Sequence, residues 1–289
     1  MTPGWLDARA YPFQSRGVEI EGARVHYVDE GQGPTVLMVH GTPTWSFLWR
    51  HLIAGLRDHH RCVALDLPGF GLSDKPPGDA YRPEDQARRL AAFVDALRLK
   101  DWTLVVHDFG GPIGLSLAIE RPDAIRRLVL FNTWMWSLAG DRQYRRVDRL
   151  FSGRLGRALY ERFGFSVNVV WRHAVRDARY TRAVHRQYAA PLADSAARHA
   201  TWIYMRSLLG SSAWYEALWA RRERLARIPA LLVWGAKDPV FAKFLPRWRS
   251  LFYRAEVMEL PDAGHAPQET RGAEVAPVVA RFLGAGRTP

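Results

Sequence analysis

Residues 103–111 read TLVVHDFGG, a short apolar run that ends in an aspartate, a phenylalanine and two glycines. Such a run is typical of a parallel strand that is covered on both faces, where an unpaired charge is costly. A strand that turns sharply into a helix at small residues is typical of a nucleophile elbow, which exposes its central side chain above the sheet. The stretch therefore predicts that Asp108 occupies such a turn, and that Gly110 and Gly111 allow it.

The chain on both sides of this stretch alternates between apolar runs and helical patterns. Residues 18–31 alternate around Glu21 and Gly22, which predicts an antiparallel hairpin. Further apolar runs lie at 35–41, 61–71, 103–108, 125–132, 229–238 and 255–265, and helical patterns lie at 83–97, 114–120 and 273–282. This alternation predicts an α/β protein with a mostly parallel sheet that helices cover on both faces.

The alternation breaks once, between residue 132 and about residue 228, where the chain is helical in pattern and rich in arginine and aromatic residues. We interpret residues 133–215 as an inserted helical cap, and residues 1–132 and 216–289 as the core. The cap follows a strand, so we expect it to cover the carboxyl ends of the strands, where open α/β sheets bind ligands. The core is expected to fold without the cap but to lack activity.

The composition narrows the class of protein. The 289 residues are 48% hydrophobic, enough for a large core, and the single cysteine, Cys62, excludes an internal disulfide framework. We expect no metal site, and the absence of a signal peptide or a long apolar stretch favours a cytoplasmic protein without a membrane span.

The net charge of +12 has an uneven distribution, because residues 141–187 hold twelve arginines and four acidic residues, a net charge of +8. We interpret this segment as a solvated helical face rather than a phosphate-binding surface, and we expect no nucleic-acid partner. A further hypothesis is that its charge attracts anionic substrates, an effect that salt would weaken.

Three polar residues follow predicted strands in the order that the α/β-hydrolase fold uses for its nucleophile, acid and base: Asp108, Asp238 and His265. A loop aspartate is commonly a helix cap or turn former, and a lone histidine is commonly structural. Residues 40–43, HGTP, add a fourth feature where that fold supplies an amide of the oxyanion hole. Four such features in order along one α/β pattern favour the catalytic interpretation.

The stretches that carry these residues resemble the haloalkane dehalogenase family of α/β-hydrolases. They read HGTPTWSFLWR at 40–50, DLPGFGLSDKP at 66–76, VVHDFGGPIGL at 105–115, VWGAKDPVF at 233–241 and PDAGHAPQE at 261–269. The resemblance spans nearly the whole chain and implies an α/β-hydrolase fold with an eight-stranded sheet and no cofactor.

For the site, the resemblance implies that Asp108 is the nucleophile, His265 the base and Asp238 the acid. Some members place the acid after the preceding strand, where this chain has Asn132. The backbone N–H groups of Thr42 and Phe109 would form the oxyanion hole.

Two departures from the family concern the leaving group. Typical members have a tryptophan after the nucleophile, where this chain has Phe109, and Asn or Glu after the His-Gly pair, where it has Thr42. A tryptophan of the cap could hold the halide instead, although core packing also explains each of these tryptophans. The candidates are Trp134, Trp136, Trp171 and Trp202.

The chemistry of an aspartate nucleophile leaves several functions open. We favour hydrolysis of a small, apolar, halogenated substrate by water through an ester on Asp108. An epoxide hydrolase would need phenols of the cap as acids, and a β-lactone decarboxylase would need no halide site. A ligand-binding protein without catalysis is the alternative of another class. The oligomeric state stays open. The candidate phenols are Tyr144, Tyr160, Tyr180, Tyr188 and Tyr204.

Overall fold

The computed structural model describes residues 3–284 and contains one eight-stranded sheet, in the order β1-β2-β4-β3-β5-β6-β7-β8. The strands are β1 (Ser15–Ile20), β2 (Ala23–Glu30), β3 (Thr35–Val39), β4 (Arg61–Leu65), β5 (Trp102–Asp108), β6 (Ile125–Thr133), β7 (Ala230–Gly235) and β8 (Glu256–Leu260). β1 and β2 form the expected antiparallel hairpin, and β2 also pairs antiparallel with β4. The remaining pairs are parallel, which confirms the mostly parallel sheet.

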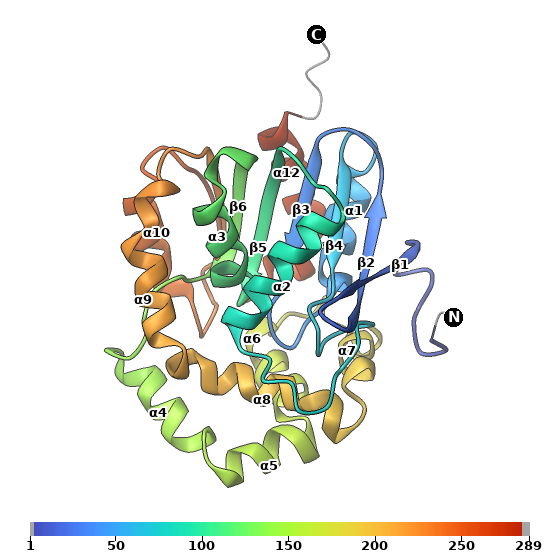
Figure 1. The fold of residues 1–289 in the computed structure, drawn as a ribbon, viewed down its shortest axis with the longest axis vertical. Coiled ribbons are helices and arrows are strands. Elements are labelled where there is room, and N and C mark those ends of the chain that lie inside the picture. The colour runs from blue at the N-terminus through green and yellow to red at the C-terminus, as the bar shows by residue number, and fades with distance from the viewer. Residues whose placement is uncertain (1–2, 285–289) are drawn as a thin grey trace.

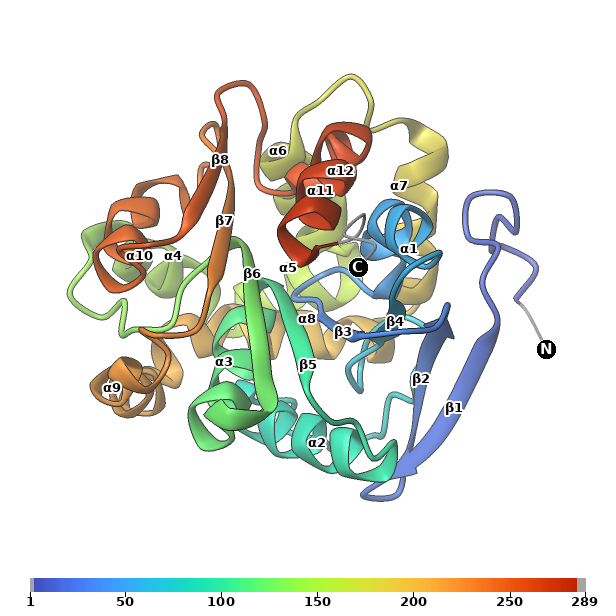
Figure 2. The same cartoon turned by 90° about the horizontal axis from the view of Figure 1, so that it is seen from above.

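Helices cover both faces of the sheet (Figure 1, Figure 2). Figure 2 shows α1, α11 and α12 on one face, and α2 and α3 on the other. The bounds are α1 (Arg50–Leu56), α2 (Pro83–Ala96), α3 (Gly110–Glu120), α10 (Leu245–Leu251), α11 (Pro267–Thr270) and α12 (Gly272–Leu283). Short 3₁₀ turns are η1 (Ser46–Trp49), η2 (Pro122–Ala124), η5 (Arg222–Arg224) and η6 (Ala242–Phe244).

The insertion between β6 and β7 is helical, and Figure 1 shows its helices α4, α5 and α8 beyond one end of the strands. It contains α4 (Arg142–Phe151), α5 (Arg154–Phe163), a π-helical turn η3 (Ser166–Trp171), α6 (Arg172–Val175), α7 (Arg182–Ala189), a 3₁₀ turn η4 (Ala190–Leu192), α8 (Ser195–Gly210) and α9 (Ser212–Ala220). Side-chain oxygens cap the first backbone N–H groups of α4, α7 and α8, since Asp141, Thr181 and Asp194 stand at their N-caps.

The insertion shares the hydrophobic core with the sheet. Tyr204 and Tyr215 belong to the cluster that contains α2 and α3, and Trp171 and Tyr188 belong to the cluster that contains α1 and α12. The boundary between residues 215 and 216 falls inside α9. The division into a core and a cap of 133–215 therefore stays a prediction.

The apolar runs were longer than the strands that they contain. β4 ends at Leu65, β7 at Gly235 and β8 at Leu260, so the polar ends of these runs form loops at the carboxyl edge of the sheet. The helix that the pattern placed at 114–120 begins earlier, at Gly110, because the turn after Asp108 enters it directly. Over residues 3–284, no helix is long and apolar enough to cross a membrane.

Candidate active site

The turn after β5 has the conformation of a nucleophile elbow. Asp108 has a φ of +54°, in the left-handed region that non-glycine residues rarely adopt, and α3 begins two residues later. Gly110 and Gly111 have no positive φ, so their role differs from the conformational one that the sequence suggested. A Cβ on Gly111 would lie 1.7 Å from Thr133 Oγ1, so glycine allows α3 to approach β6.

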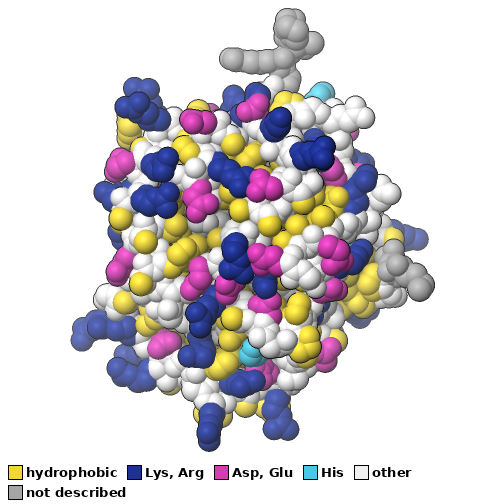
Figure 3. Space-filling view, in the orientation of Figure 1, with side chains coloured by type: hydrophobic (Ala, Val, Ile, Leu, Met, Phe, Trp, Pro, Cys, Tyr) yellow, Lys and Arg dark blue, Asp and Glu magenta, His cyan; other side chains and the backbone are white. Residues whose placement is uncertain are grey.

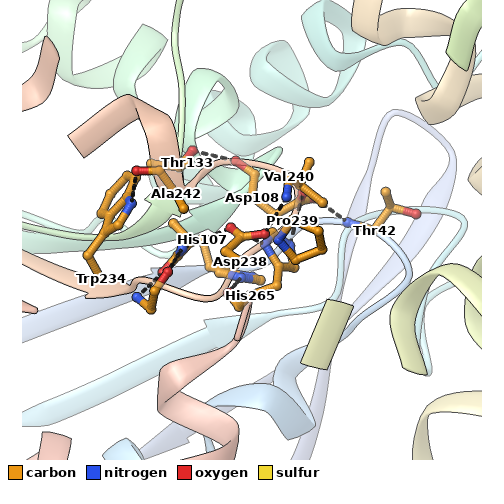
Figure 4. A network of polar contacts seen from close by, with 12 residues as sticks. Thr42, His107, Asp108, Thr133, Trp234, Asp238, Pro239, Val240, Ala242 and His265 are labelled. Atoms are coloured by element: carbon orange, nitrogen blue, oxygen red, sulfur yellow. Dashed lines mark hydrogen bonds and ion pairs between the residues drawn. The ribbon is translucent and has the colours of Figure 1, made fainter. Parts of the chain in front are cut away.

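The carboxylate of Asp108 lies beside His265, which lies beside Asp238 (Figure 4). His265 Nε2 is 3.4 Å from Asp108 Oδ2, and its Nδ1 donates to Asp238 Oδ2 at 2.9 Å. All three side chains are buried. The structure thus brings the three predicted catalytic residues together, in the arrangement of a nucleophile, a base and an orienting acid.

Asn132 is a partner of this arrangement that the sequence did not reveal. Its Nδ2 donates to Asp238 Oδ2 at 2.8 Å, and its Oδ1 accepts from the backbone N–H of Gly235 at 2.8 Å. The other carboxylate oxygen of Asp238 accepts from the N–H of Val240 at 2.7 Å. Asn132 occupies the position where some family members carry the acid, and in this chain it holds the acid, Asp238, in place. The motif comparison pointed to this position without indicating its contact.

The backbone of His265 is held from both sides. Its N–H donates to the carbonyl of Ala174 in the insertion at 2.9 Å, and its carbonyl accepts from His107 Nε2 at 2.9 Å. Burial, with the positive charge of His265 beside it, holds the pKa of His107 well below its usual value. His107 is therefore a neutral donor that positions His265, and the two rings lie 4.6 Å apart.

The two carboxylates determine the charge of His265. Burial by itself would lower the pKa of His265, but the charge of Asp238, the hydrogen bonds and the charge of Asp108 together raise it to about 10. His265 is therefore an imidazolium at neutral pH. Any reaction that neutralises Asp108 removes one source of this effect and lowers the pKa of His265, so that the neutral form, which can accept a proton, is populated.

The oxyanion-hole residues lie next to the carboxylate. Thr42 N–H donates to Asp108 Oδ1 at 2.9 Å, whereas Figure 4 shows the side chain of Thr42 pointing away from Asp108. A Cβ on Gly41 would lie 2.1 Å from Asp108 Oδ1 and 2.6 Å from the amide nitrogen of Phe109. Glycine at this position leaves room for a carboxylate oxygen between two backbone amides, as an oxyanion hole requires.

His40 keeps this loop in place. Its Nδ1 donates to the carbonyl of Gly41 at 2.8 Å, and its Nε2 accepts from the N–H of Leu67 at 2.9 Å. Both ring nitrogens are used and burial lowers its pKa, so His40 is neutral and structural. It is not a second base.

A cavity of about 380 Å³ opens above Asp108 and His265, and most of its walls are apolar. Its wall residues from the insertion include Tyr144, Phe151, Tyr160, Phe165 and Trp171. In residues 3–284, no group of His, Cys, Asp and Glu side chains is placed to hold a metal ion. The cavity therefore presents the carboxyl group of Asp108 in an apolar environment, which suits an uncharged substrate.

Of the four tryptophans considered for the leaving group, Trp171 alone is part of the cavity wall. Its Nε1 is buried and has no hydrogen-bond partner in the described part of the chain, and the phenol of Tyr180 is a polar neighbour of its indole. Trp202 Nε1 donates to the carbonyl of Phe151 at 3.1 Å. Trp136 packs against Phe244 and Trp248, away from the cavity.

Trp134 lies behind Phe109, with ring centroids 4.7 Å apart, and it does not reach the cavity wall. Its Nε1 and the hydroxyls of Tyr204 and Tyr215 are buried without a partner among residues 3–284. The ring of Phe109 packs on both Trp134 and Tyr204. Buried donors thus exist near the nucleophile, but an apolar ring stands where the family usually has an indole N–H.

The phenols that an epoxide hydrolase would need are mostly engaged elsewhere. Tyr144 donates to the carbonyl of Val240, and Tyr188 donates to Glu269. Tyr180 shares a hydrogen bond of 3.1 Å with His185 Nδ1. Tyr144 and Tyr160 line the cavity, whereas the other three candidates do not.

Comparison with known proteins agrees with the geometry. The family model described as the alpha/beta hydrolase fold matches residues 34–272. The chain belongs to the α/β-hydrolase fold family. Its sequence is 37% identical over 286 residues to Haloalkane dehalogenase 2 of Mycobacterium tuberculosis, covering 96% of this chain and 98% of that protein.

The chain is also similar to proteins with another named activity. The chain is 34% identical to the cis-3-alkyl-4-alkyloxetan-2-one decarboxylase of Shewanella oneidensis, covering 94% of this chain and 89% of the relative. Among solved structures, the haloalkane dehalogenase DbeA from Bradyrhizobium elkani superimposes with a TM-score of 0.83 at 27% identity, over 95% of this chain and all of that one. The similarity to dehalogenases thus extends from the sequence to the fold.

Proposed function

We propose that the protein is a hydrolase of the haloalkane dehalogenase type, which cleaves a carbon–halogen bond through an alkyl ester on Asp108. The observation that carries the proposal is the left-handed turn at Asp108, which holds an ionised carboxylate in an apolar cavity beside a histidine between two carboxylates. A carboxylate needs no base to attack saturated carbon. A serine-type ester hydrolysis would need a hydroxyl at this position.

The first step forms the ester. A carboxylate oxygen of Asp108 attacks the carbon that bears the halogen, and the halide leaves with the bonding electrons. Asp108 becomes neutral, so the pKa of His265 falls and its proton passes to solvent. Release of one halide and one proton balances this step.

The second step hydrolyses the ester. His265 takes a proton from water, and the resulting hydroxide attacks the carbonyl carbon of Asp108. The N–H groups of Thr42 and Phe109 stabilise the oxyanion. Collapse of the intermediate releases the alcohol, which takes its proton from His265, and the acid proton of Asp108 then returns to His265. The resting charges are restored, and oxygen from water stays in Asp108.

For the leaving group, we propose Trp171 as the cavity-wall donor that replaces the indole missing at position 109. Its unpartnered Nε1 and its ring, 6.0 Å from that of His265, support this role. Phe109 contributes its backbone N–H and an apolar wall. Trp134, Trp136 and Trp202 are left out, since they do not line the cavity.

The second candidate function is β-lactone opening with loss of carbon dioxide. Similarity to the oxetan-2-one decarboxylases and the absence of a donor on the side chain of Phe109 favour it. A panel of bromoalkanes, epoxides and β-lactones distinguishes the candidates, with bromide, diol and alkene measured. Bromide release supports the dehalogenase, whereas alkene from a β-lactone without bromide release across the panel supports the decarboxylase.

The covalent intermediate is tested with His265→Ala. This variant should still alkylate Asp108 but not hydrolyse the ester, so the intact mass should rise by one alkyl group in a peptide that contains residues 103–111. An Asp108→Ala/His265→Ala control should gain no mass. In the parent enzyme, one turnover in ¹⁸O-water should label Asp108. Label in the alcohol alone would show that Asp108 acts as a general base instead.

Two expectations about the setting of this reaction also stay proposals. A cytoplasmic location is the first, and the absence of a nucleic-acid partner is the second.

A further inference from the structure

The insertion exposes large apolar side chains on helix α5. Leu155 is 74% exposed and Phe163 is 68% exposed. They lie eight residues apart, and the half-buried Leu159 lies midway, so the three side chains share one stripe of the helix. The adjoining side of α5 is used for packing, since Gly156 and Tyr160 are buried. Within the described part of the chain, packing therefore does not explain why the exposed residues of this stripe are apolar.

The same surface continues to the mouth of the cavity. Val169 and Val170 are exposed in η3, which follows α5 after two residues, and both line the cavity. Leu150 is exposed on α4, one turn after the cavity residue Val147. We call this surface the cap rim; its members are Leu150, Leu155, Phe163, Val169 and Val170.

Most arginines of the segment that carries the cap rim are not neutralised by an ion pair. Of the twelve arginines in residues 141–187, ten form no ion pair with any residue in the range 3–284: Arg142, Arg145, Arg146, Arg149, Arg154, Arg162, Arg172, Arg176, Arg182 and Arg186. Figure 3 shows Lys and Arg side chains projecting along the lower edge of the molecule, where Figure 1 places α4 and α5. Exposed leucine and phenylalanine among unpaired arginines are the pattern of a helix that lies in a membrane interface.

We propose that the cap rim binds an anionic lipid surface, with its apolar side chains at the boundary between headgroups and acyl chains and the arginines on the headgroup phosphates. Charge argues against a second copy as the occupant, because residues 141–187, which carry the rim, have a net charge of +8 and two such segments would repel each other. The apolar residues are spread over α4, α5 and η3, and a deformable lipid surface fits such a spread more readily than the matched pockets of a protein partner. A helix lying on a membrane needs no spanning segment.

The position of the rim suggests what such binding achieves. The cavity is apolar and its mouth is bordered by Val169 and Val170, so an apolar substrate dissolved in lipid would enter without crossing bulk water. Lipid binding itself depends on no catalytic residue, so its test is independent of the test of the proposed reaction.

The test is co-sedimentation of the full chain with vesicles of phosphatidylcholine alone and of equal parts phosphatidylcholine and phosphatidylglycerol. Binding to the anionic vesicles only, weakened by salt, is expected. Leu155→Ser/Phe163→Ser should reduce partition by about tenfold or more, because it removes two exposed apolar side chains. Arg162→Glu should also reduce it. Circular dichroism and thermal unfolding verify that each variant is folded.

Tyr253 and Arg254 offer a matched control outside the cap rim. Tyr253 is 71% exposed, and the guanidinium of Arg254 lies 5.2 Å from its ring centroid. Tyr253→Ser and Arg254→Glu should leave vesicle binding unchanged. Equal losses in the control and cap-rim variants would overturn the proposal. So would no binding to anionic vesicles, binding to polyglutamate without vesicle binding, or a dimer in size-exclusion chromatography that Leu155→Ser/Phe163→Ser dissociates.

Discussion

Replacing Asp108 with asparagine tests how the charge of the nucleophile controls the base. The amide side chain that Asp108→Asn introduces is neutral and carries a carbonyl oxygen, so it mimics the charge of the ester intermediate. His265 Nε2 lies 3.4 Å from Asp108 Oδ2. At an effective dielectric constant of about 20, two opposite charges at this distance attract each other by about 5 kcal/mol. This energy corresponds to a pKa shift of between about three and four units.

We therefore expect the pKa of His265, about 10 in the parent, to fall by about three units in Asp108→Asn, toward neutrality. The fall should be slightly smaller than the Coulomb value, since the amide oxygen still accepts a hydrogen bond. NMR titration of the His265 ring, labelled with ¹³C or ¹⁵N, measures this pKa directly. Asp238→Asn is the comparison, because the larger effect of the Asp238 charge means that its loss should lower the pKa at least as much.

A pKa of His265 in Asp108→Asn that stays within about half a unit of the parent value would refute this reasoning, because one unit corresponds to about 1.4 kcal/mol. The proton release that we assign to ester formation would then have no electrostatic cause. His265 would have to be a neutral base already in the resting enzyme.

Three further predictions concern the surroundings of the site. Asn132→Ala should lower kcat about tenfold with little change in KM, because Asp238 loses a charge-assisted hydrogen bond of about 1.5 kcal/mol; an unchanged kcat would show that Asn132 only aligns the strands. Gly111→Ala should lower the thermal unfolding temperature, since its Cβ would meet Thr133 Oγ1, and Thr133→Ala should restore part of the loss; equal stability of Gly111→Ala and the parent would contradict the close approach. Because the pKa of His265 is raised from its ordinary 6.5 to about 10, its ion pairs stabilise the fold fully below pH 6.5 and are lost as the pH rises through about 10; denaturant unfolding that gives a constant free energy across this window would contradict the assigned charge.

The sequence by itself determined the fold and the order of the central site residues. Apolar runs that alternate with helical patterns predicted the parallel sheet, and polar residues at the ends of three of these runs predicted a site at its carboxyl edge. This worked because strands of a parallel sheet all end at one edge, so residues far apart in the chain meet once the sheet forms. The prediction that Asp108, Asp238 and His265 form the site required no knowledge of side-chain packing.

Tertiary structure decided what lines the cavity and what supports the site. Trp171 faces the cavity while Trp134, Trp136 and Trp202 pack elsewhere, and Asn132 and His107 hold Asp238 and His265 through contacts between distant segments. The insertion has no sheet register that would dictate which side of each helix faces inward. The direction of its aromatic side chains depends on how α4, α5, η3 and α8 pack together, and only the folded chain specifies that packing.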